Sequence, residues 1–189
     1  LGDFRTAGEP LGVGPRLHHG LGVGIACFDQ FSDVVEGVEH QQGLLQGVSS
    51  HGADFGIIHF LQTIYESNRL LVPIIEEHSG ILLKVEGDSL LVIFRSVNEA
   101  IECAVAMQGC AKEYNHQRAE NEQLLLCIGL GYGDVLRIGD SDVFGAEVNA
   151  ASKLGEDTAR AHEILLTGAV KKAANENMNA CFESIDTVP

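Results

Sequence analysis

Two aspartates, Asp29 and Asp88, stand where two strand ends could hold divalent cations between them. Asp88 lies in the short turn between apolar runs at 81–85 and 89–94, and Asp29 follows an apolar run at 23–28. Hard cations such as Mg²⁺ prefer oxygen ligands, and a pair of carboxylates on neighbouring strands supplies them. Glycine and aspartate are also the ordinary residues of tight turns, so Asp88 is equally open to a purely structural interpretation.

The elements that would position these aspartates follow from the spacing of apolar residues. The run at 23–28 is short and bounded by turn residues, which favours a buried strand, and 81–85 with 89–94 predicts a tight β-hairpin. A long connection is expected at 34–56. The other predicted elements are, in order, an amphipathic helix at 57–75 in which Pro73 is a candidate for a kink, a helix at 97–111, a pair of strands at 124–129 and 135–138 around Gly131 and Gly133, a helix at 147–157, a strand at 163–166, a short helix at 169–174 and a strand at 181–185. This alternation predicts an α+β fold with a ferredoxin-like core, an antiparallel-rich sheet flanked by helices.

Length and composition limit the class of protein. The chain of 189 residues has the length of one domain, expected at 21–189 after an irregular lead-in at 1–20. The net charge of −15 repels polyanions, so no nucleic acid is expected, and it favours a divalent cation beside any phosphate ligand. No apolar run reaches the roughly 18 residues that cross a bilayer, so no membrane segment is expected. Five cysteines without a C-x-x-C pair favour a reducing, cytoplasmic location and argue against structural zinc. The chain starts at Leu1 without a signal-peptide pattern, and we expect it to be a fragment truncated at its C-terminus.

Two sequence motifs connect the hairpin to a known family. The first is LKVEGDSLLVIF at 83–94, and the second is IGLGYG at 128–133 followed by DVFGAEVNAASKL at 142–154. In this order and separation they resemble the catalytic domains of class III nucleotidyl cyclases, the adenylate and guanylate cyclases, over about residues 21–186. The resemblance implies the cyclase fold and a substrate of ATP or GTP. It further implies attack of the ribose 3′-hydroxyl on the α-phosphate, release of pyrophosphate, and two Mg²⁺ or Mn²⁺ ions.

The resemblance also assigns roles to individual residues. Asp88 matches the second metal-binding aspartate of the family, and Asn149 matches the asparagine that orients the ribose. Lys84 and Asp142 fall where adenylate cyclases read the base, because an ammonium can donate to adenine N1 while a carboxylate accepts from N6. Lys153 stands where the family has an arginine that stabilises transition-state charge. A lysine on a strand and an aspartate in a loop are also ordinary surface residues.

Three departures from the family pattern bear on activity. Aligning Phe31-Ser32 with the family's F-T pair puts Cys27 at the first metal-binding position, with Asp29 two residues late, and Cys is a poor ligand for Mg²⁺. Lys153 keeps the charge of the expected arginine but loses its planar fork. The family's triphosphate-binding lysine in a late strand has no counterpart after Cys181. The neighbouring pair at 171–172, Lys171 and Lys172, precedes it on a predicted helix and does not match.

Two functions therefore remain open. The first is an adenylate cyclase domain that makes cyclic AMP as a homodimer, with metal ligands from one subunit and base-reading residues from the other. The second is a weak or silent cyclase-homology domain that acts as a nucleotide-binding or dimerising regulatory module. Lys84 with Asp142 favours the enzyme, whereas Cys27, Lys153 and the missing late lysine favour the module.

Overall fold

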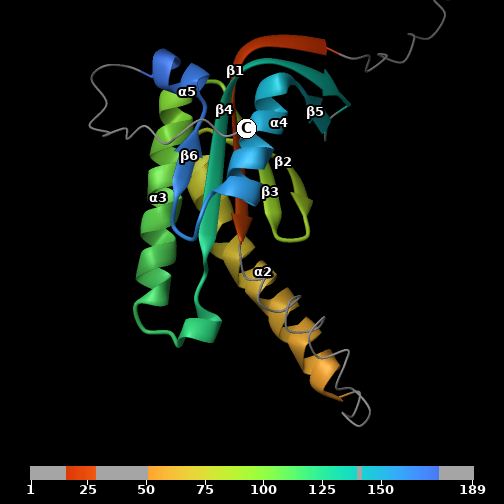
Figure 1. Ribbon diagram of the computed structural model, residues 1–189, viewed down its shortest axis with the longest axis vertical. Coiled ribbons are helices and arrows are strands. Elements are labelled where there is room, and N and C mark those ends of the chain that lie inside the picture. The colour runs from red at the N-terminus through yellow and green to blue at the C-terminus, as the bar shows by residue number, and fades with distance from the viewer. Residues whose placement is uncertain (1–15, 29–50, 140–141, 175–189) are drawn as a thin grey trace, which may run out of the picture.

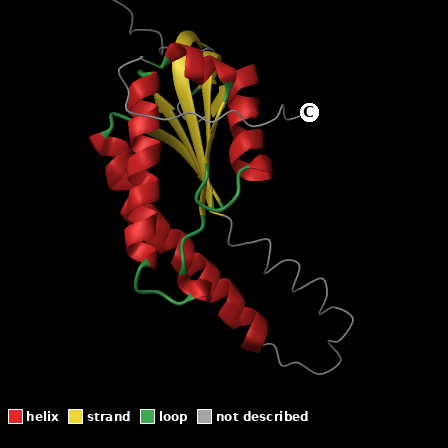
Figure 2. Ribbon diagram, turned by 60° about the vertical axis from the view of Figure 1, so that its left-hand side comes forward, coloured by secondary structure: helices red, strands yellow, loops and turns green. Residues whose placement is uncertain are grey.

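The computed structural model describes residues 16–28, 51–139 and 142–174, which form a sheet with helices on both faces (Figures 1 and 2). The elements are, in order, β1 (Arg16–Phe28), α2 (His51–Glu77), β2 (Ile81–Glu86), β3 (Ser89–Phe94), α3 (Val97–Asn115), a single 3₁₀ turn (Glu120–Glu122), β4 (Leu126–Ile138), β5 (Asp142–Phe144), α4 (Ala146–Ser152), a π-helical turn (Lys153–Thr158), β6 (Ile164–Leu166) and α5 (Gly168–Ala173). This mixture of helices and a mainly antiparallel sheet confirms the predicted α+β class.

The sheet has the strand order β2-β3-β1-β4-β5, and β6 pairs with β4 outside this path. Among the described strands, every pairing is antiparallel except that of β4 with β6, which is parallel. The predicted hairpin forms as β2 and β3, with Gly87 in the left-handed region of backbone space at φ 56°. A positive φ suits glycine because it has no side chain to clash with the backbone.

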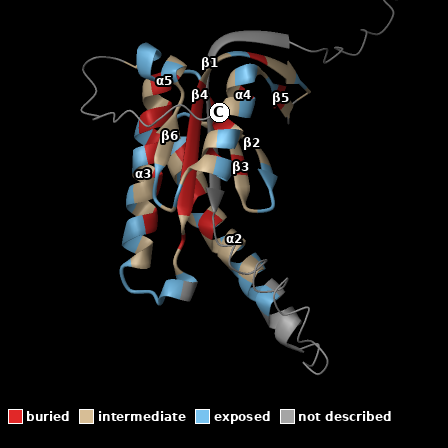
Figure 3. Cartoon of the chain, viewed as in Figure 1, coloured by how far each residue is buried: buried red, intermediate tan, exposed pale blue. Residues whose placement is uncertain are grey.

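The main core lies on the face of the sheet that α2 and α3 cover. Strand side chains alternate between the two faces, and the even-numbered residues of β3 and β4 point to this core. The core combines these with apolar side chains of the helices, among them Leu71, Ile75, Leu90, Val92, Phe94, Ala100, Cys103, Met107, Leu126, Ile128 and Leu130. Figure 3 shows the buried residues along much of β4. Burial of one such large side chain stabilises the fold by about 1.5–3 kcal/mol relative to leaving it exposed.

Helix α2 is longer than its predicted counterpart at 57–75. It begins at His51, inside the stretch at 34–56 expected to be a connection, and it continues through Pro73 to Glu77. The exposed side chain of Pro73 lies on the solvent side of the helix. The N-terminal end of α2 extends away from the sheet (Figure 1). Among the described residues, no helix combines the length and apolar character that a membrane span requires.

Two predicted strand boundaries were wrong. The pair of strands expected at 124–129 and 135–138 is one continuous strand, β4, which runs through Gly131 and Gly133 and forms its hairpin with β5 instead. Strand β1 begins at Arg16, inside the stretch expected to be an irregular lead-in. The predicted strand at 181–185 lies outside the described residues.

Candidate active site

The second face of the sheet holds a smaller apolar cluster, beneath α4. It contains the buried side chains of Ile93, Val135, Val143 and Val148, with Leu83 and Leu91 packed against it. Members of this cluster come from β2, β3, β4, β5 and α4. The cluster therefore joins the two ends of the strand order, β2 and β5, across one face of the sheet.

A β-bulge in β2 decides which residues of that strand face this cluster. Leu82 pairs with Val92, whereas Lys84 pairs with Leu91, so one additional residue lies between the two pairs. Val92 belongs to the main core, and Leu91 packs on the α4 side of the sheet. A bulge shifts the alternation of side chains by one position. Lys84 thus lies on the same face as α4, the face on which the cluster brings β5 close.

Lys84 and Asp142 meet on this face. The Lys84 Nζ atom lies 3.7 Å from Asp142 Oδ1 and 2.6 Å from Glu86 Oε1. The side chain of Lys84 is 36% exposed, so the protein covers it only in part. The hydrogen bond with Glu86, and then the charges of Glu86 and Asp142, raise the pKa of Lys84 above its usual value. Lys84 therefore keeps its positive charge at neutral pH and is held between two carboxylates.

The sequence interpretation missed Glu86. A signal was present, because residues two apart on a strand share one face, which places Glu86 on the same side as Lys84. Its carboxylate is the nearer of the two around the Lys84 ammonium.

The hairpin tip lies beside the end of β1. Cys27 pairs with Ser89 in the sheet, and Ser89 directly follows Asp88. The carboxylate of Asp88 is a suitable oxygen ligand for a hard cation, whereas a Cys27 thiol is not. Asp29 lies outside the described residues. In the part of the chain that the structure describes, no three His, Cys, Asp or Glu side chains converge as a metal site. Of the two predicted metal ligands the structure thus describes Asp88, whose carboxylate is an oxygen donor of the kind that Mg²⁺ or Mn²⁺ prefers.

Helix α4 sits directly on the glycines of β4. A Cβ atom at Gly129 would overlap the backbone carbonyl of Ala151, and one at Gly131 would overlap that of Glu147. Glycine inside a strand often marks such a close approach of another backbone segment. The small side chain of Ala151, which is fully buried, lies at this contact. These glycines, whose spacing suggested a turn in the sequence, therefore allow α4 to pack closely on β4. We call this contact surface the glycine seat of α4.

Asn149 and Lys153 lie on the exposed surface of α4 and of the π-helical turn that follows it. Both side chains are solvent-exposed, and they are four residues apart, about one helical turn. Lys153 directly follows α4 and begins the π-helical turn, where the hydroxyl of Thr158 donates to the Lys153 carbonyl at 2.9 Å. The structure thus places Asn149, Lys153, Lys84 and Asp142 on elements that share one side of the sheet.

Glu147 is a second residue that the sequence interpretation missed. Its Oε2 atom accepts hydrogen bonds from the Tyr132 backbone N–H at 3.2 Å and from the Thr167 hydroxyl at 2.7 Å. The motif at 142–154 contains it, but nothing in its spacing indicated a partner fifteen or twenty residues away.

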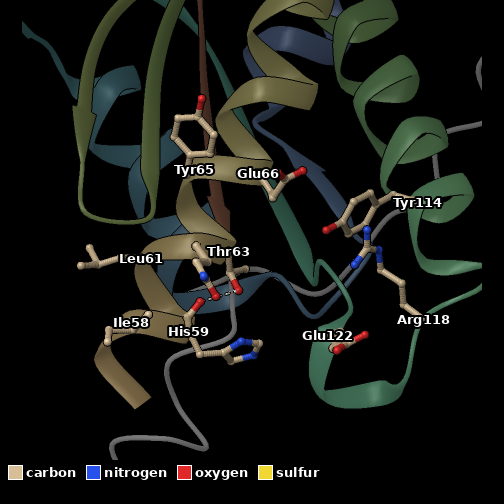
Figure 4. Close-up of a pocket in the computed structure, with 10 residues that line it drawn as sticks. Ile58, His59, Leu61, Thr63, Tyr65, Glu66, Tyr114, Arg118 and Glu122 are labelled. Carbon is tan, nitrogen blue, oxygen red and sulfur yellow. Dashed lines mark hydrogen bonds between the residues drawn. The ribbon is translucent and has the colours of Figure 1, made fainter. Parts of the chain in front are cut away.

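A separate hollow lies near the start of α2. It has a volume of about 710 Å³ and is lined by residues of α2, by Tyr114 near the end of α3, and by Arg118 and Glu122 of the segment that follows (Figure 4). The Arg118 guanidinium lies 3.8 Å from the centre of the Tyr114 ring. None of the predicted site residues that the structure describes lines this hollow, which sets it apart from Lys84, Asp142, Asn149 and Lys153.

Comparisons with known proteins agree with the fold and with the motifs. The family model for the adenylate and guanylate cyclase catalytic domain matches residues 31–188. The serine/threonine-protein kinase pkn2 of Myxococcus xanthus is 36% identical over 108 residues, 57% of this chain and 13% of that protein. "Putative adenylate cyclase 3" of Rhizobium meliloti (strain 1021) is 36% identical over 85 residues, 45% of this chain and 14% of that protein. The chain thus spans about an eighth of the length of these curated relatives.

Solved structures show the same fold at low identity. The adenylate/guanylate cyclase/hydrolase from Silicibacter pomeroyi has a TM-score of 0.67 at 20% identity, covering 91% of this chain and 88% of that chain. The guanylyl cyclase Cya2 has a TM-score of 0.63 at 19% identity, covering 88% and 82%. Because the family model covers most of the sequence and the folds agree, this chain belongs to the adenylate and guanylate cyclase catalytic domain family.

Proposed function

We propose that this chain converts ATP to 3′,5′-cyclic AMP and pyrophosphate. The observation that carries the choice of ATP is the Lys84 ammonium 3.7 Å from the Asp142 carboxylate. Adenine offers an acceptor at N1 and a donor at N6, which such a pair satisfies. Guanine offers N1–H and O6 instead, so the ammonium would face a donor and the carboxylate would face an acceptor.

In the proposed reaction the ribose 3′-oxygen attacks the α-phosphorus. A bond forms between O3′ and the α-phosphorus, the bond to the oxygen that bridges to the β-phosphorus breaks, the hydroxyl proton is released, and pyrophosphate leaves. Asn149 orients the ribose, and the exposed ammonium of Lys153 stabilises charge that develops on the phosphate oxygens. Asp88, with Asp29, would hold two Mg²⁺ or Mn²⁺ ions, which supply positive charge for the triphosphate and favour the ionised hydroxyl.

The proposal includes a homodimer with its two sites at the subunit interface, in the cytoplasm. The family resemblance implies metal ligands from one subunit and base-reading residues from its partner. Mixing two inactive variants tests this directly. If Asp88→Ala and Lys84→Ala damage different subunits of one site, the mixture recovers about a quarter of the parent turnover, because half of the dimers have one intact site. Two residues that serve one site from the same subunit give no recovery.

The experiment that tests the activity itself measures cyclic AMP from ATP with Mn²⁺ in the parent and in Asp88→Ala. Asp88 lies in the short turn between β2 and β3, so we expect the variant to lose turnover while its unfolding midpoint stays close to that of the parent. Asp157→Ala is the matched control, because Asp157 is an exposed carboxylate with no proposed role. Equal turnover in Asp88→Ala and the parent would remove Asp88 from the site.

A silent regulatory domain is the second candidate. It is favoured by Cys27 at the first metal-binding position and by Lys153 in place of arginine. A parent protein that binds ATP in the presence of Mn²⁺ without forming cyclic AMP would establish this alternative.

A further inference from the structure

We infer that Glu147 is a positioning residue. Its carboxylate fixes α4 to β4 and thereby sets where Asn149 and Lys153 lie. The part of this inference that concerns catalysis rests on the proposed function, whereas the anchoring of α4 stands on the fold alone.

One edge of β4 has a gap between two strands that pair with it. On this side of the strand, β6 pairs with residues 128–130 and β5 pairs with residues 136–138. Tyr132 lies between the two paired stretches, and its backbone N–H donates to Glu147 Oε2 at 3.2 Å. A backbone N–H inside a fold needs an acceptor. The Glu147 carboxylate supplies it at a position that no described strand pairs.

The same oxygen of Glu147 accepts a second hydrogen bond, from a third part of the fold. The hydroxyl of Thr167, the residue before α5, donates to Glu147 Oε2 at 2.7 Å. The Thr167 backbone N–H in turn donates to the Leu130 carbonyl at 2.9 Å. One carboxylate oxygen thus joins α4, β4 and the junction of β6 with α5.

The stem of the Glu147 side chain also packs closely against β4. A Cβ atom at Gly133 would stand 2.7 Å from Glu147 Cγ, so the stem of the glutamate occupies the space above that glycine. The backbone carbonyl of Glu147 covers Gly131 in the same way. Both the main chain and the side chain of Glu147 are therefore fitted to β4.

Anchoring of α4 by Glu147 affects the site because α4 is a rigid segment that carries other site residues. Glu147 lies in the first turn of α4, and Asn149 and Lys153 follow on the same helical segment. A turn that detaches from β4 moves both side chains together. Displacements of about 1 Å in a positioned catalytic group can reduce the rate by about a hundredfold.

Two conservative variants separate an anchoring role from a role of the charge itself. Glu147→Gln keeps a side-chain oxygen at the same reach but removes the charge. Glu147→Asp keeps the charge but is one methylene too short to reach both donors. An anchor tolerates Gln and fails with Asp, whereas a metal ligand or a general base shows the opposite order.

The test measures kcat and KM for ATP with Mn²⁺, together with amide hydrogen exchange of residues 146–152, in the full chain. We expect Glu147→Asp to lower kcat about tenfold or more with KM within about threefold, and to speed exchange of α4 about tenfold. Glu147→Gln stays close to the parent in both measurements, and Glu156→Asp, on the exposed π-helical turn, is the matched control. Thr167→Val removes one of the two donors and shifts both measurements in the direction of Glu147→Asp, which keeps the test available if Glu147→Asp does not fold.

Several outcomes overturn the inference. Loss of turnover in Glu147→Gln with retention in Glu147→Asp would show that the charge of Glu147 acts in the reaction, as a metal ligand or a general base. Unchanged α4 exchange in both Glu147→Asp and Thr167→Val would show that the carboxylate anchors nothing. A parent without cyclic AMP formation contradicts the proposed function alone, and the exchange measurements then still decide whether Glu147 anchors α4.

Discussion

Lys84 and Asp142 approach to 3.7 Å although their strands, β2 and β5, stand at opposite ends of the strand order. The approach has two structural causes. The small apolar cluster under α4 joins the two strands across one face of the sheet. The bulge after Leu82 turns Lys84 to that face. The pair that would read the base is thus a product of the tertiary fold and of one irregularity in β2.

The glycine seat of α4 gives the first prediction, on stability. Gly131→Ala should reduce the free energy of unfolding by about 3 kcal/mol, because the new Cβ overlaps the Glu147 carbonyl and α4 must move. Gly109→Ala is the matched change in α3, where a Cβ meets nothing within 4 Å. It should stabilise the protein by about 0.5–1 kcal/mol, as alanine does in an exposed helix. Urea unfolding of the two variants measures both values, and equal shifts in the two would contradict the seat.

The second prediction concerns the lysine that replaces the family's arginine. Lys153→Arg should raise kcat about threefold or more with KM nearly unchanged, because a bidentate guanidinium binds developing phosphate charge better than a point charge. Lys112→Arg, at an exposed position of α3, controls for the general effect of arginine. Steady-state kinetics with ATP and Mn²⁺ give both constants. Identical kcat in Lys153→Arg and the parent would mean that this segment does not face the phosphates.

The third prediction concerns the buried thiol of α3. Burial raises the pKa of Cys103 from its ordinary 9.0 to about 12. The unfolded state therefore releases this proton first, and the contribution of Cys103 to stability is present below pH 9 and is lost as the pH rises toward 12. At pH 8 the native protein should leave Cys103 unmodified by iodoacetamide while the half-buried Cys110 reacts slowly. Peptide mass spectrometry follows both sites, and equal rates in the native protein would contradict the buried position.

The sequence predicted the parts of the fold that depend on local patterns. The hairpin of β2 and β3 and the helix α3 follow from apolar spacing alone, and both are present. The interpretation failed at β4, because Gly131 and Gly133 have the composition of a turn when read alone. Their function as a seat depends on α4, a segment that follows more than ten residues later in the chain.

In the candidate site, too, some residues could be predicted from the sequence and others could not. Lys84 and Asp142 were paired by resemblance to a family, and the structure adds their distance and the bulge that makes it possible. The alternation of a strand could have indicated Glu86 beside Lys84. Glu147 could not have been found in this way, since its two partners lie on other elements and are recognised only when β4, α4 and Thr167 come together.

The central claim is that Lys84 and Asp142 select ATP, and the ratio of kcat/KM for ATP to that for GTP tests it most directly. The measurement uses Mn²⁺ and compares the parent with the double variant Lys84→Glu/Asp142→Cys. We expect the parent to prefer ATP and the double variant to lose or reverse this preference by tenfold or more, because a glutamate accepts from guanine N1–H while the carboxylate that repels O6 is gone. A parent that prefers GTP, or a ratio that is the same in both proteins while turnover persists, would contradict the account.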